Sequence, residues 1–259
     1  MHPILVELGP LELPTYGVML LVGIALGLWT ARRRARRVGL DGDRVVDLGL
    51  WLILGGLAGA KLLLVITEPS YLTSLRGLWS LLRAGGVFYG GLIGALVAAV
   101  ILLRRHRLPV LPVTDVLAPS VALGHFFGRL GCFFAGCCYG SHCERPWAVV
   151  FTDPQAAEIS GTPLGVPLHP VQLYEAAFNL ANFFILSWVF ARRPRGADGI
   201  VLGTYLITYG AARFILEYFR GDADRGFVLW QALSTSQAIA AVAVLAGLAL
   251  VTLAWRRRS

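Results

Sequence analysis

The stretch Gly124–Gly140, GHFFGRLGCFFAGCCYG, places an arginine inside a segment that otherwise has the composition of a membrane helix. Arg129 stands in an apolar run, and Cys132, Cys137 and Cys138 follow it closely. An arginine at the centre of a membrane costs at least about 2.5 kcal/mol on insertion scales, so it normally faces the protein interior and has a partner. Its planar guanidinium binds phosphate or carboxylate groups through paired hydrogen bonds. The stretch therefore predicts a polar site inside a helical membrane bundle.

Composition supports the same class of protein. Hydrophobic residues make up 56% of the 259-residue chain and charged residues only 15%, whereas soluble domains contain about 25% charged residues. The net charge of +8 would suggest a nucleic-acid partner in a soluble protein. Here the basic residues stand in short clusters between apolar runs, without interleaved aromatic residues. We therefore expect an all-α integral membrane protein with no nucleic-acid partner.

Seven apolar runs approach the roughly 20 residues that a helix needs to cross a bilayer. These runs are Leu13–Thr30, Val45–Ile66, Val87–Leu103, Val113–Ala135, Leu168–Ala191, Ile200–Phe219 and Ser234–Trp255. Basic clusters follow alternate runs, at Arg32–Arg37, Arg104–Arg107, Arg192–Arg195 and Arg256–Arg258. The positive-inside rule places such clusters in the cytoplasm. The pattern predicts a bundle of seven transmembrane helices with the N-terminus outside and the C-terminus cytoplasmic.

This topology predicts a single membrane-embedded domain, residues 1–259, with outer loops at about 67–86, 136–167 and 220–233. Polar residues that are unusual in membrane helices then converge on the outer half of the bundle. They are Arg129, His169, Gln172, Glu175, Arg213 and Glu217. Arg213, Glu217 and Arg220 have the spacing of one helical face. An Arg213–Glu217 pair that only fixes helix packing is the simpler interpretation, but the whole set favours a polar cavity reached from the outer leaflet.

Several short motifs occur in a recognisable order. They are Tyr16-Gly17, Gly90–Gly94 (GGLIG), Asp115-x-x-Ala118-Pro119, Gly128–Gly131 (GRLG), His169–Glu175 (HPVQLYE), Tyr209-Gly210, Arg213-Phe214, Glu217 and Arg220. Over nearly its whole length the chain resembles the prolipoprotein diacylglyceryl transferase family. The resemblance implies an enzyme of the bacterial inner membrane, with its active site towards the outer face.

The same resemblance implies a reaction. The diacylglyceryl group of phosphatidylglycerol is transferred to the thiol of a lipobox cysteine, and glycerol phosphate is released. The expected partners are phosphatidylglycerol, a prolipoprotein signal peptide with its lipobox cysteine, and membrane lipids; no cofactor is expected. Two alternatives remain open: a diverged paralogue that acts on another acceptor, or a carrier that binds anionic lipid without chemistry.

Roles for individual residues follow from the resemblance and from the chemistry. The departing phosphate needs preorganised positive charge, which we assign to Arg129 and Arg213, with Arg220 as an outer helper. Further substrate-binding candidates are Tyr16, Gln172, Glu175 and Glu217. The acceptor thiol, with a free pKa of about 8.5, must lose its proton. The family usually has a histidine before the third-span glycines, but this chain has Tyr89, so we rank His169 first and Tyr89 second as the base.

The cysteines are a second departure from the family. After the GRLG motif the family usually reads Asn-Phe-x-Asn-x-Glu, whereas Cys132 and Cys137 stand here at the first and last of these positions. An oxidising exterior permits disulfides, so we rank bridges among Cys132, Cys137, Cys138 and Cys143 first and assign no metal site. A zinc site, a catalytic or acyl-carrying cysteine, and inert packing remain alternatives.

Overall fold

The computed structural model describes residues 2–8, 11–83, 86–221, 226–228 and 233–256. Its long helices are α1 (Thr15–Arg37), α2 (Gly42–Thr67), α4 (Phe88–Arg105), α5 (Val110–Ala135), α7 (Val171–Arg192), α8 (Ile200–Leu216) and α9 (Thr235–Arg256). Shorter helical segments are η1 (Pro69–Leu72), α3 (Leu75–Arg83), α6 (Pro154–Ser160) and η2 (Glu217–Phe219). Three small antiparallel pairs complete the fold: β1 (Ile4–Leu8) with β2 (Leu11–Pro14), β3 (Val149–Val150) with β4 (Pro167–Leu168), and β5 (Phe227–Val228) with β6 (Leu233–Ser234).

Six of the helices within the described residues are long and apolar enough to cross a membrane. They are α1, α2, α5, α7, α9 and the continuous segment Ile200–Phe219 formed by α8 and η2. The all-α, multi-pass membrane class predicted from the sequence is therefore confirmed. The run predicted as the third span is the helix α4 of 18 residues. Parts of two predicted outer loops, residues 84–85, 222–225 and 229–232, lie outside the described residues.

The helix bounds differ from the predicted runs mainly at their basic ends. The first run was expected to end at Thr30, but α1 continues through Arg37. Arg104 and Arg105 are likewise the last residues of α4, and Arg192 is the last residue of α7. Positive side chains are favourable near the C-terminal end of a helix, where backbone carbonyl groups lack partners. The basic clusters therefore begin on helices and not in loops.

The chain divides into two compact units, Met1–Thr30 with Thr114–Ser259, and Ala31–Val113. In the second unit, α2 packs closely against α4. A side-chain carbon at Gly94 would collide with the carbonyl oxygen of Gly55, and one at Gly59 would collide with that of Gly90. Small residues of this kind allow two membrane helices to approach closely. The glycines of both helices therefore hold α2 and α4 together.

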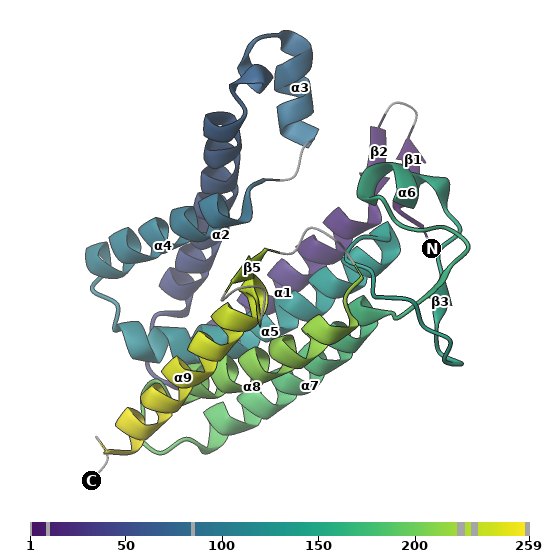
Figure 1. Cartoon of the computed structure of the whole chain (residues 1–259). Coiled ribbons are helices and arrows are strands. Elements are labelled where there is room, and N and C mark those ends of the chain that lie inside the picture. Colours follow the sequence, from purple (N-terminus) through teal and green to yellow (C-terminus); the bar gives the residue numbers. More distant parts are fainter. Residues whose placement is uncertain (1, 9–10, 84–85, 222–225, 229–232, 257–259) are drawn as a thin grey trace. The chain divides into compact units, whose positions relative to one another are not determined.

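The first unit contains α5, α7, α8, α9 and most of α1, drawn as a bundle in Figure 1. Contacts fix α1 alongside α5, because Gly23 lies against Phe127 and Gly27 against Ser120. Helix α9 packs against α8, where Gly203 and Gly247 allow the two backbones to approach. This bundle positions most of the residues predicted to form the site.

Asp115 fixes the start of α8. Its fully buried carboxylate accepts hydrogen bonds from the backbone N–H groups of Gly199, Val201 and Leu202, at 2.9 to 3.1 Å. It also pairs with Arg193 at 2.6 Å. The first N–H groups of a helix have no partner within the helix. Asp115 therefore caps α8 from the neighbouring helix α5.

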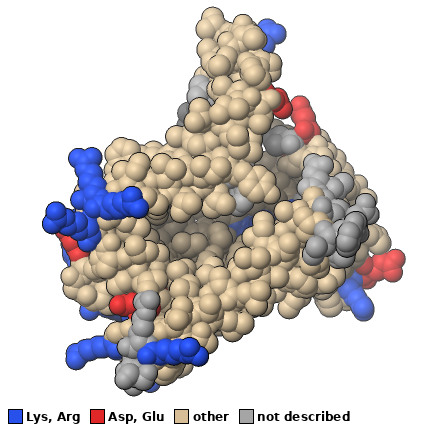
Figure 2. All heavy atoms as spheres, turned by 60° about the vertical axis from the view of Figure 1, so that its left-hand side comes forward, with Lys and Arg blue, Asp and Glu red and all other residues tan. Residues whose placement is uncertain are grey.

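Uncharged residues cover most of the face drawn in Figure 2, and the Lys and Arg side chains gather in separate groups. Large apolar side chains are exposed along the long helices, among them Leu21, Phe184, Trp188, Val242 and Leu245, each more than 60% accessible. Exposed apolar surface on this scale marks contact with a membrane or a partner. Together with the long apolar helices, it is the surface expected of a protein embedded in lipid.

Candidate functional site

A buried ion pair of the predicted set joins α5 to α7. The Arg129 Nε atom lies 3.1 Å from Glu175 Oε2, and the two side chains are only 22% and 4% exposed. Both residues were predicted for the site from the sequence, and the structure brings them into direct contact. Arg129 therefore has the buried partner that an arginine at this depth requires.

Glu175 also connects α7 to α8. Its other oxygen, Oε1, accepts a hydrogen bond from the Tyr209 hydroxyl at 3.2 Å. The Tyr209 ring stacks on the Tyr205 ring at 5.5 Å, and the Tyr205 hydroxyl lies 3.2 Å from His125 Nδ1. A polar network thus runs from Arg129 through a carboxylate and two tyrosines to a histidine on α5.

A second arginine stands on α8. Arg213 pairs with Glu217 at 2.6 Å and donates a hydrogen bond to Ser236 Oγ of α9 at 3.1 Å. The Tyr209 hydroxyl lies within electrostatic reach of both Arg129 and Arg213. The Arg213–Glu217 pair, which the sequence left open as the simpler interpretation, is present in the structure.

Arg220 differs from its predicted position. The α-helix ends at Leu216, the 3-10 turn η2 follows, and Arg220 has extended backbone angles of φ −75° and ψ 142°. It therefore does not continue the helical face of Arg213 and Glu217, and that expectation was wrong. Arg220 instead forms a backbone bridge to Gly140, in the segment that follows the cysteines.

Backbone hydrogen bonds hold this cysteine segment against two other parts of the site. The Gly140 N–H donates to the His169 carbonyl at 3.1 Å, and the His169 N–H donates to the Ser141 carbonyl at 2.9 Å. On the other side, the Gly221 N–H donates to the Tyr139 carbonyl at 3.2 Å. The segment therefore links the start of α7 to the end of α8.

Gln172 adds a side-chain contact to the same segment. Its Nε2 donates to the carbonyl oxygen of Cys137 at 2.8 Å, while the residue is only 1% exposed. Its Oε1 has no hydrogen-bond partner within the described part of the chain. An acceptor that is buried without a partner is costly, so Gln172 Oε1 is available to a hydrogen-bond donor that enters the site.

His169 lies at the start of α7 and is partly buried. Its Nδ1 lies 3.1 Å from the Tyr174 hydroxyl, and its ring packs edge-on against Phe219 at 5.3 Å. Tyr174 therefore fixes the orientation of the imidazole. The backbone contacts of His169 place it beside the cysteine segment.

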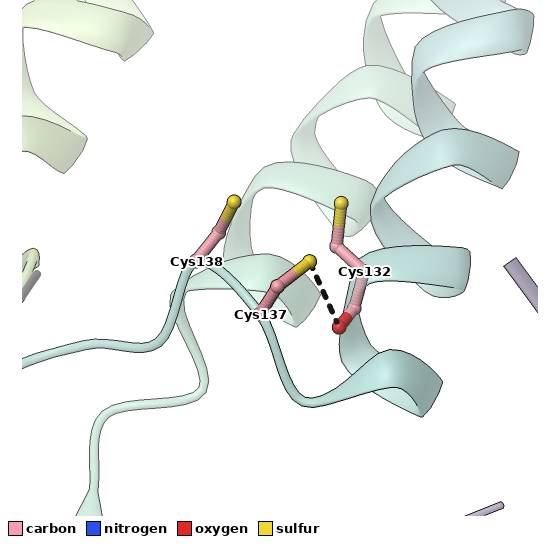
Figure 3. A group of neighbouring side chains, drawn as sticks. All are labelled: Cys132, Cys137 and Cys138. Atoms are coloured by element: carbon pink, nitrogen blue, oxygen red, sulfur yellow. Dashed lines mark hydrogen bonds between the residues drawn. The ribbon is translucent and has the colours of Figure 1, made fainter. Parts of the chain in front are cut away.

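Three of the four cysteines form a cluster. The sulfur atoms of Cys132, Cys137 and Cys138 all lie within 4.8 Å of one another. In the view of Figure 3, the three sulfurs form a triangle, and the Cys137 thiol donates to the Cys132 carbonyl at 3.8 Å. All four cysteines are unbridged, and Cys143 is buried outside the cluster. The disulfides proposed from the sequence stay a prediction.

The cluster is electrostatically linked to the arginines. The pKa of the Cys138 thiol is lowered by the side-chain interactions with Cys132 and Cys137, and burial only partly opposes this. The guanidinium groups of Arg129 and Arg220 contribute to the same lowering of the pKa. Cys138 is therefore the thiol of the cluster that loses its proton first.

Two tyrosines predicted for the site have different surroundings. Tyr16, in the first turn of α1, packs against Gly131, and its hydroxyl is within electrostatic reach of Cys132 and Arg129. Tyr89, in the first turn of α4, belongs to the other compact unit and is 53% exposed. The structure brings Tyr16 to the arginine, while a shared site with Tyr89 stays a prediction.

Sequence reasoning missed part of the polar network. Asn179 and Asn182 are fully buried on α7. Asn179 Nδ2 donates to the Glu175 carbonyl at 2.9 Å, and Asn182 Oδ1 accepts from Thr208 at 3.0 Å. Their signal was present, because they repeat at helical spacing on the same face as Glu175. Tyr205 and His125 gave no comparable signal.

A cavity of about 600 Å³ lies within the second unit, between α2 and α4. It is lined by Asp47, Trp51, Gly55, Gly94, Val97, Ala98, Ile101, Leu102, Arg105 and His106. None of the predicted site residues is among them.

Long apolar helices around buried arginine–carboxylate pairs define a multi-pass membrane protein with a polar site in its interior. The sequence profile of the family described as "Prolipoprotein diacylglyceryl transferase" matches residues 3–253. The chain belongs to the prolipoprotein diacylglyceryl transferase family and is a membrane transferase, as the sequence predicts.

Individual relatives match over nearly the whole length of both chains. A protein of Clostridium tetani named phosphatidylglycerol–prolipoprotein diacylglyceryl transferase is 35% identical over 248 residues, 96% of each chain. Proteins of the same name are 36% identical in Nitratidesulfovibrio vulgaris, over 95% of this chain and 92% of the relative, and 34% identical in Azotobacter vinelandii, over 99% and 96%. The similarity therefore includes every element that contributes to the site.

Proposed function

We propose that this chain transfers the diacylglyceryl group of phosphatidylglycerol to the lipobox cysteine thiol of bacterial prolipoproteins and releases glycerol phosphate. The observation that carries the proposal is the full-length similarity to transferases whose names state these substrates, at 35% identity over 96% of both chains. The buried pairs of arginine and glutamate support it, because the reaction expels a phosphate group in a water-poor site.

Arg129 and Arg213 hold the lipid phosphate. Each guanidinium is mostly buried and pairs with a carboxylate of the described residues, Arg129 with Glu175 and Arg213 with Glu217. These carboxylates fix the two arginines before substrate arrives and compensate their charge. A bound phosphate would then accept hydrogen bonds from the remaining N–H groups, and charge-assisted contacts of this kind are about twice as strong as neutral ones.

The other predicted substrate contacts surround these arginines. The free Oε1 of Gln172 accepts a hydroxyl of the glycerol headgroup. Tyr16 and Arg220 lie within electrostatic reach of the cysteine cluster and bind substrate on that side. The contacts of Glu175 and Glu217 with the arginines make both carboxylates positioning residues.

His169 is the first candidate for the base that removes the proton from the acceptor thiol. Its contact with Tyr174 fixes the orientation of the ring, and the intrinsic pKa of histidine suits proton transfer at neutral pH. Tyr89, which stands where the family usually has histidine, is the second candidate. The free pKa of tyrosine is near 10, so it would need a neighbouring positive charge to act at neutral pH.

We extend the proposal to the membrane topology. Helix α4, with 18 residues, is about 27 Å long at 1.5 Å per residue, close to the thickness of the hydrocarbon core. Counting it gives seven spans in one domain, with the N-terminus outside and the basic helix ends in the cytoplasm. The site then faces the outer side of the bacterial inner membrane, where lipid enters sideways and the signal peptide approaches.

The alternatives remain a paralogue with another acceptor and a carrier of anionic lipid. The observation that favours them is Cys137 at the position of the usual glutamate. A carrier would bind phosphatidylglycerol through Arg129 and Arg213 without turnover.

The test uses purified protein, phosphatidylglycerol vesicles and a lipobox peptide under reducing conditions, with the thioether product measured by mass spectrometry. We expect product from the wild type, none from Arg129→Ala, and normal product from Arg145→Ala, which removes an exposed loop arginine. Lipid binding that depends on Arg129, with no product from any folded protein, would replace the transferase with the carrier.

A further inference from the structure

The cysteine cluster has no role in the reaction proposed above. Cys132 lies in the last turn of α5, and Cys137 and Cys138 follow the helix after a turn at Gly136. Their three sulfur atoms lie within 4.8 Å of one another. We propose that these three cysteines bind a zinc ion whose fourth position takes and activates the acceptor thiol. The activation of the acceptor thiol by the ion rests on the proposed transferase function, whereas the binding of the ion does not.

The distances fit a zinc ion with small side-chain adjustments. Tetrahedral zinc binds thiolates at about 2.3 Å, which places ligand sulfurs about 3.8 Å apart. The observed limit of 4.8 Å is within reach of that arrangement by rotation about the Cα–Cβ bonds. A disulfide would join two of the sulfurs and leave the third unused, whereas a metal ion uses all three.

The backbone that carries the ligands is held in place. Gly136 and Cys138 both have positive φ, 78° and 59°. Positive φ is costly for a residue with a side chain and persists only where the surroundings enforce it. Here Thr162 donates to the Gly136 carbonyl at 2.9 Å, and Gln172 donates to the Cys137 carbonyl at 2.8 Å. These contacts fix Cys137 and Cys138 towards Cys132 before any ion binds.

The charges around the cluster suit three bound thiolates. Three thiolates and one Zn²⁺ ion carry a net charge of −1, and this charge is costly in a mostly buried site unless it is compensated. Arg129 and Arg220 both interact electrostatically with Cys138. Positively charged neighbours of this kind also favour the thiolate form, which is the form that binds metals.

Three protein ligands leave one coordination position open. Structural zinc sites normally have four protein ligands, whereas catalytic sites have three and bind water or substrate at the fourth position. A thiol that coordinates such an ion loses its proton, and metal coordination is one established way to activate a nucleophile. In this chain the ion would supply what the missing family histidine supplies elsewhere.

The reaction step balances without an oxidant or reductant. The acceptor thiol binds zinc, and its proton passes to the base, for which His169 is the first candidate. Its sulfur then attacks the carbon of the diacylglyceryl group that is bonded to the phosphate oxygen. A C–S bond forms at this carbon, and its C–O bond to the phosphate breaks. The electron pair of that bond leaves with the phosphate oxygen of glycerol phosphate, which the arginines hold. The neutral thioether is a weak ligand and leaves the ion. Cys132 is one turn from Arg129 on α5, about 4.5 Å along the helix axis. An acceptor thiol bound to the ion would therefore lie near the phosphate that Arg129 holds.

The first test measures metal binding without turnover. Full-length protein in detergent is reduced, stripped with a chelator and titrated with Zn²⁺ or Co²⁺. We expect one ion per chain and, with Co²⁺, a sulfur-to-cobalt charge-transfer absorption. Cys132→Ser and Cys138→Ser should each weaken binding at least tenfold. Cys143→Ser is the matched control, since Cys143 is outside the cluster, and it should bind the ion like the wild type.

The second test asks whether the ion takes the acceptor. Lipobox peptide is added to the Co²⁺ protein without lipid, so that no product forms. The charge-transfer absorption should increase, because a fourth thiolate joins three, and a peptide with serine in place of its cysteine should cause no change. This readout does not depend on the transfer reaction, so it separates the zinc site from the transferase function.

Several results would overturn the inference. One is a reduced wild-type protein that binds no ion, or binds it equally well without Cys132 and Cys138. Another is evidence of a disulfide. In that case the peptide that contains the cluster, taken from protein isolated without reductant, would be two hydrogens lighter, and the reduced protein would bind no metal. Full transfer activity after complete zinc removal would reject the activating role and leave the proposed transferase function intact.

Discussion

Glu175 holds Arg129 with one carboxylate oxygen and accepts the Tyr209 hydroxyl with the other, at 3.1 and 3.2 Å. Its side chain is only 4% exposed, so water contributes little to either contact. One carboxylate on α7 thereby positions groups from α5 and α8. The orientation of the Arg129 guanidinium, and with it the proposed contact to a lipid phosphate, depends on this residue.

Replacing Glu175 by glutamine tests that dependence. Glutamine has nearly the same shape but removes the charge, so Arg129 loses its ion pair and adopts more than one orientation. We expect kcat/KM for phosphatidylglycerol to fall about 10- to 100-fold, the effect of losing about 1.4 to 2.8 kcal/mol of transition-state stabilisation. Glu158→Gln, at an exposed position on α6, is the control. Unchanged kinetics for Glu175→Gln would show that Arg129 does not need this partner.

We expect substitution of Asp115 to change stability and not catalysis, because its contacts are structural. Asp115→Asn removes the ion pair with Arg193 and weakens the cap of α8. We expect the free energy of unfolding to drop by about 2 to 4 kcal/mol, measured as a lower thermal midpoint in detergent. Per folded molecule, kcat should stay close to that of the wild type.

Asp41 provides the matched comparison. Asp41 caps the start of α2 in the same manner, through Asp43 and Arg44, but on the exposed surface. Asparagine is an equally good cap at such positions, so Asp41→Asn should change the thermal midpoint little. Equal effects of the two substitutions would argue against a special role for the buried carboxylate.

The sequence predicted the membrane class and the charged residues of the polar network, for a simple physical reason. Charged groups inside apolar runs are costly, so residues such as Arg129 and Glu175 stand out in the sequence and were expected in the same outer half of the bundle. Helical spacing alone offered the pairing of Arg213 with Glu217 as the simpler interpretation, and the structure has this pair at 2.6 Å.

Other features could not be read from local patterns. Arg220 has helical spacing from Glu217, but the helix ends at Leu216 because the chain turns to pair with Gly140. Such pairing depends on segments about 80 residues apart. The cap of α8 by Asp115 and the gathering of three sulfurs are tertiary contacts of the same kind, and neither has a local sequence signal.

The close contact of α2 and α4 predicts a strong effect of a small substitution. Gly94→Ala places a methyl group against the Gly55 carbonyl, so the helices must separate. We expect a loss of about 1 to 3 kcal/mol in the free energy of unfolding, seen as a lower thermal midpoint. Gly124→Ala is the control, because a methyl group there meets nothing within 4 Å. If both variants were equally stable, the helix contact would not limit stability.

His169 and Tyr174 give a prediction that separates chemistry from orientation. His169→Gln keeps a polar group but removes the base, so kcat should fall at least 100-fold, within the range typical of general bases. Tyr174→Phe keeps the base and removes only the hydroxyl 3.1 Å from Nδ1, so kcat should fall roughly 3- to 10-fold, since orientation alone is lost.

The pH dependence of kcat distinguishes the two roles. Loss of a base removes the acidic limb of the profile, whereas loss of orientation lowers the whole profile and keeps that limb. An acidic limb that persists in His169→Gln would exclude His169 as the base and direct attention to Tyr89 or to the metal-bound thiol.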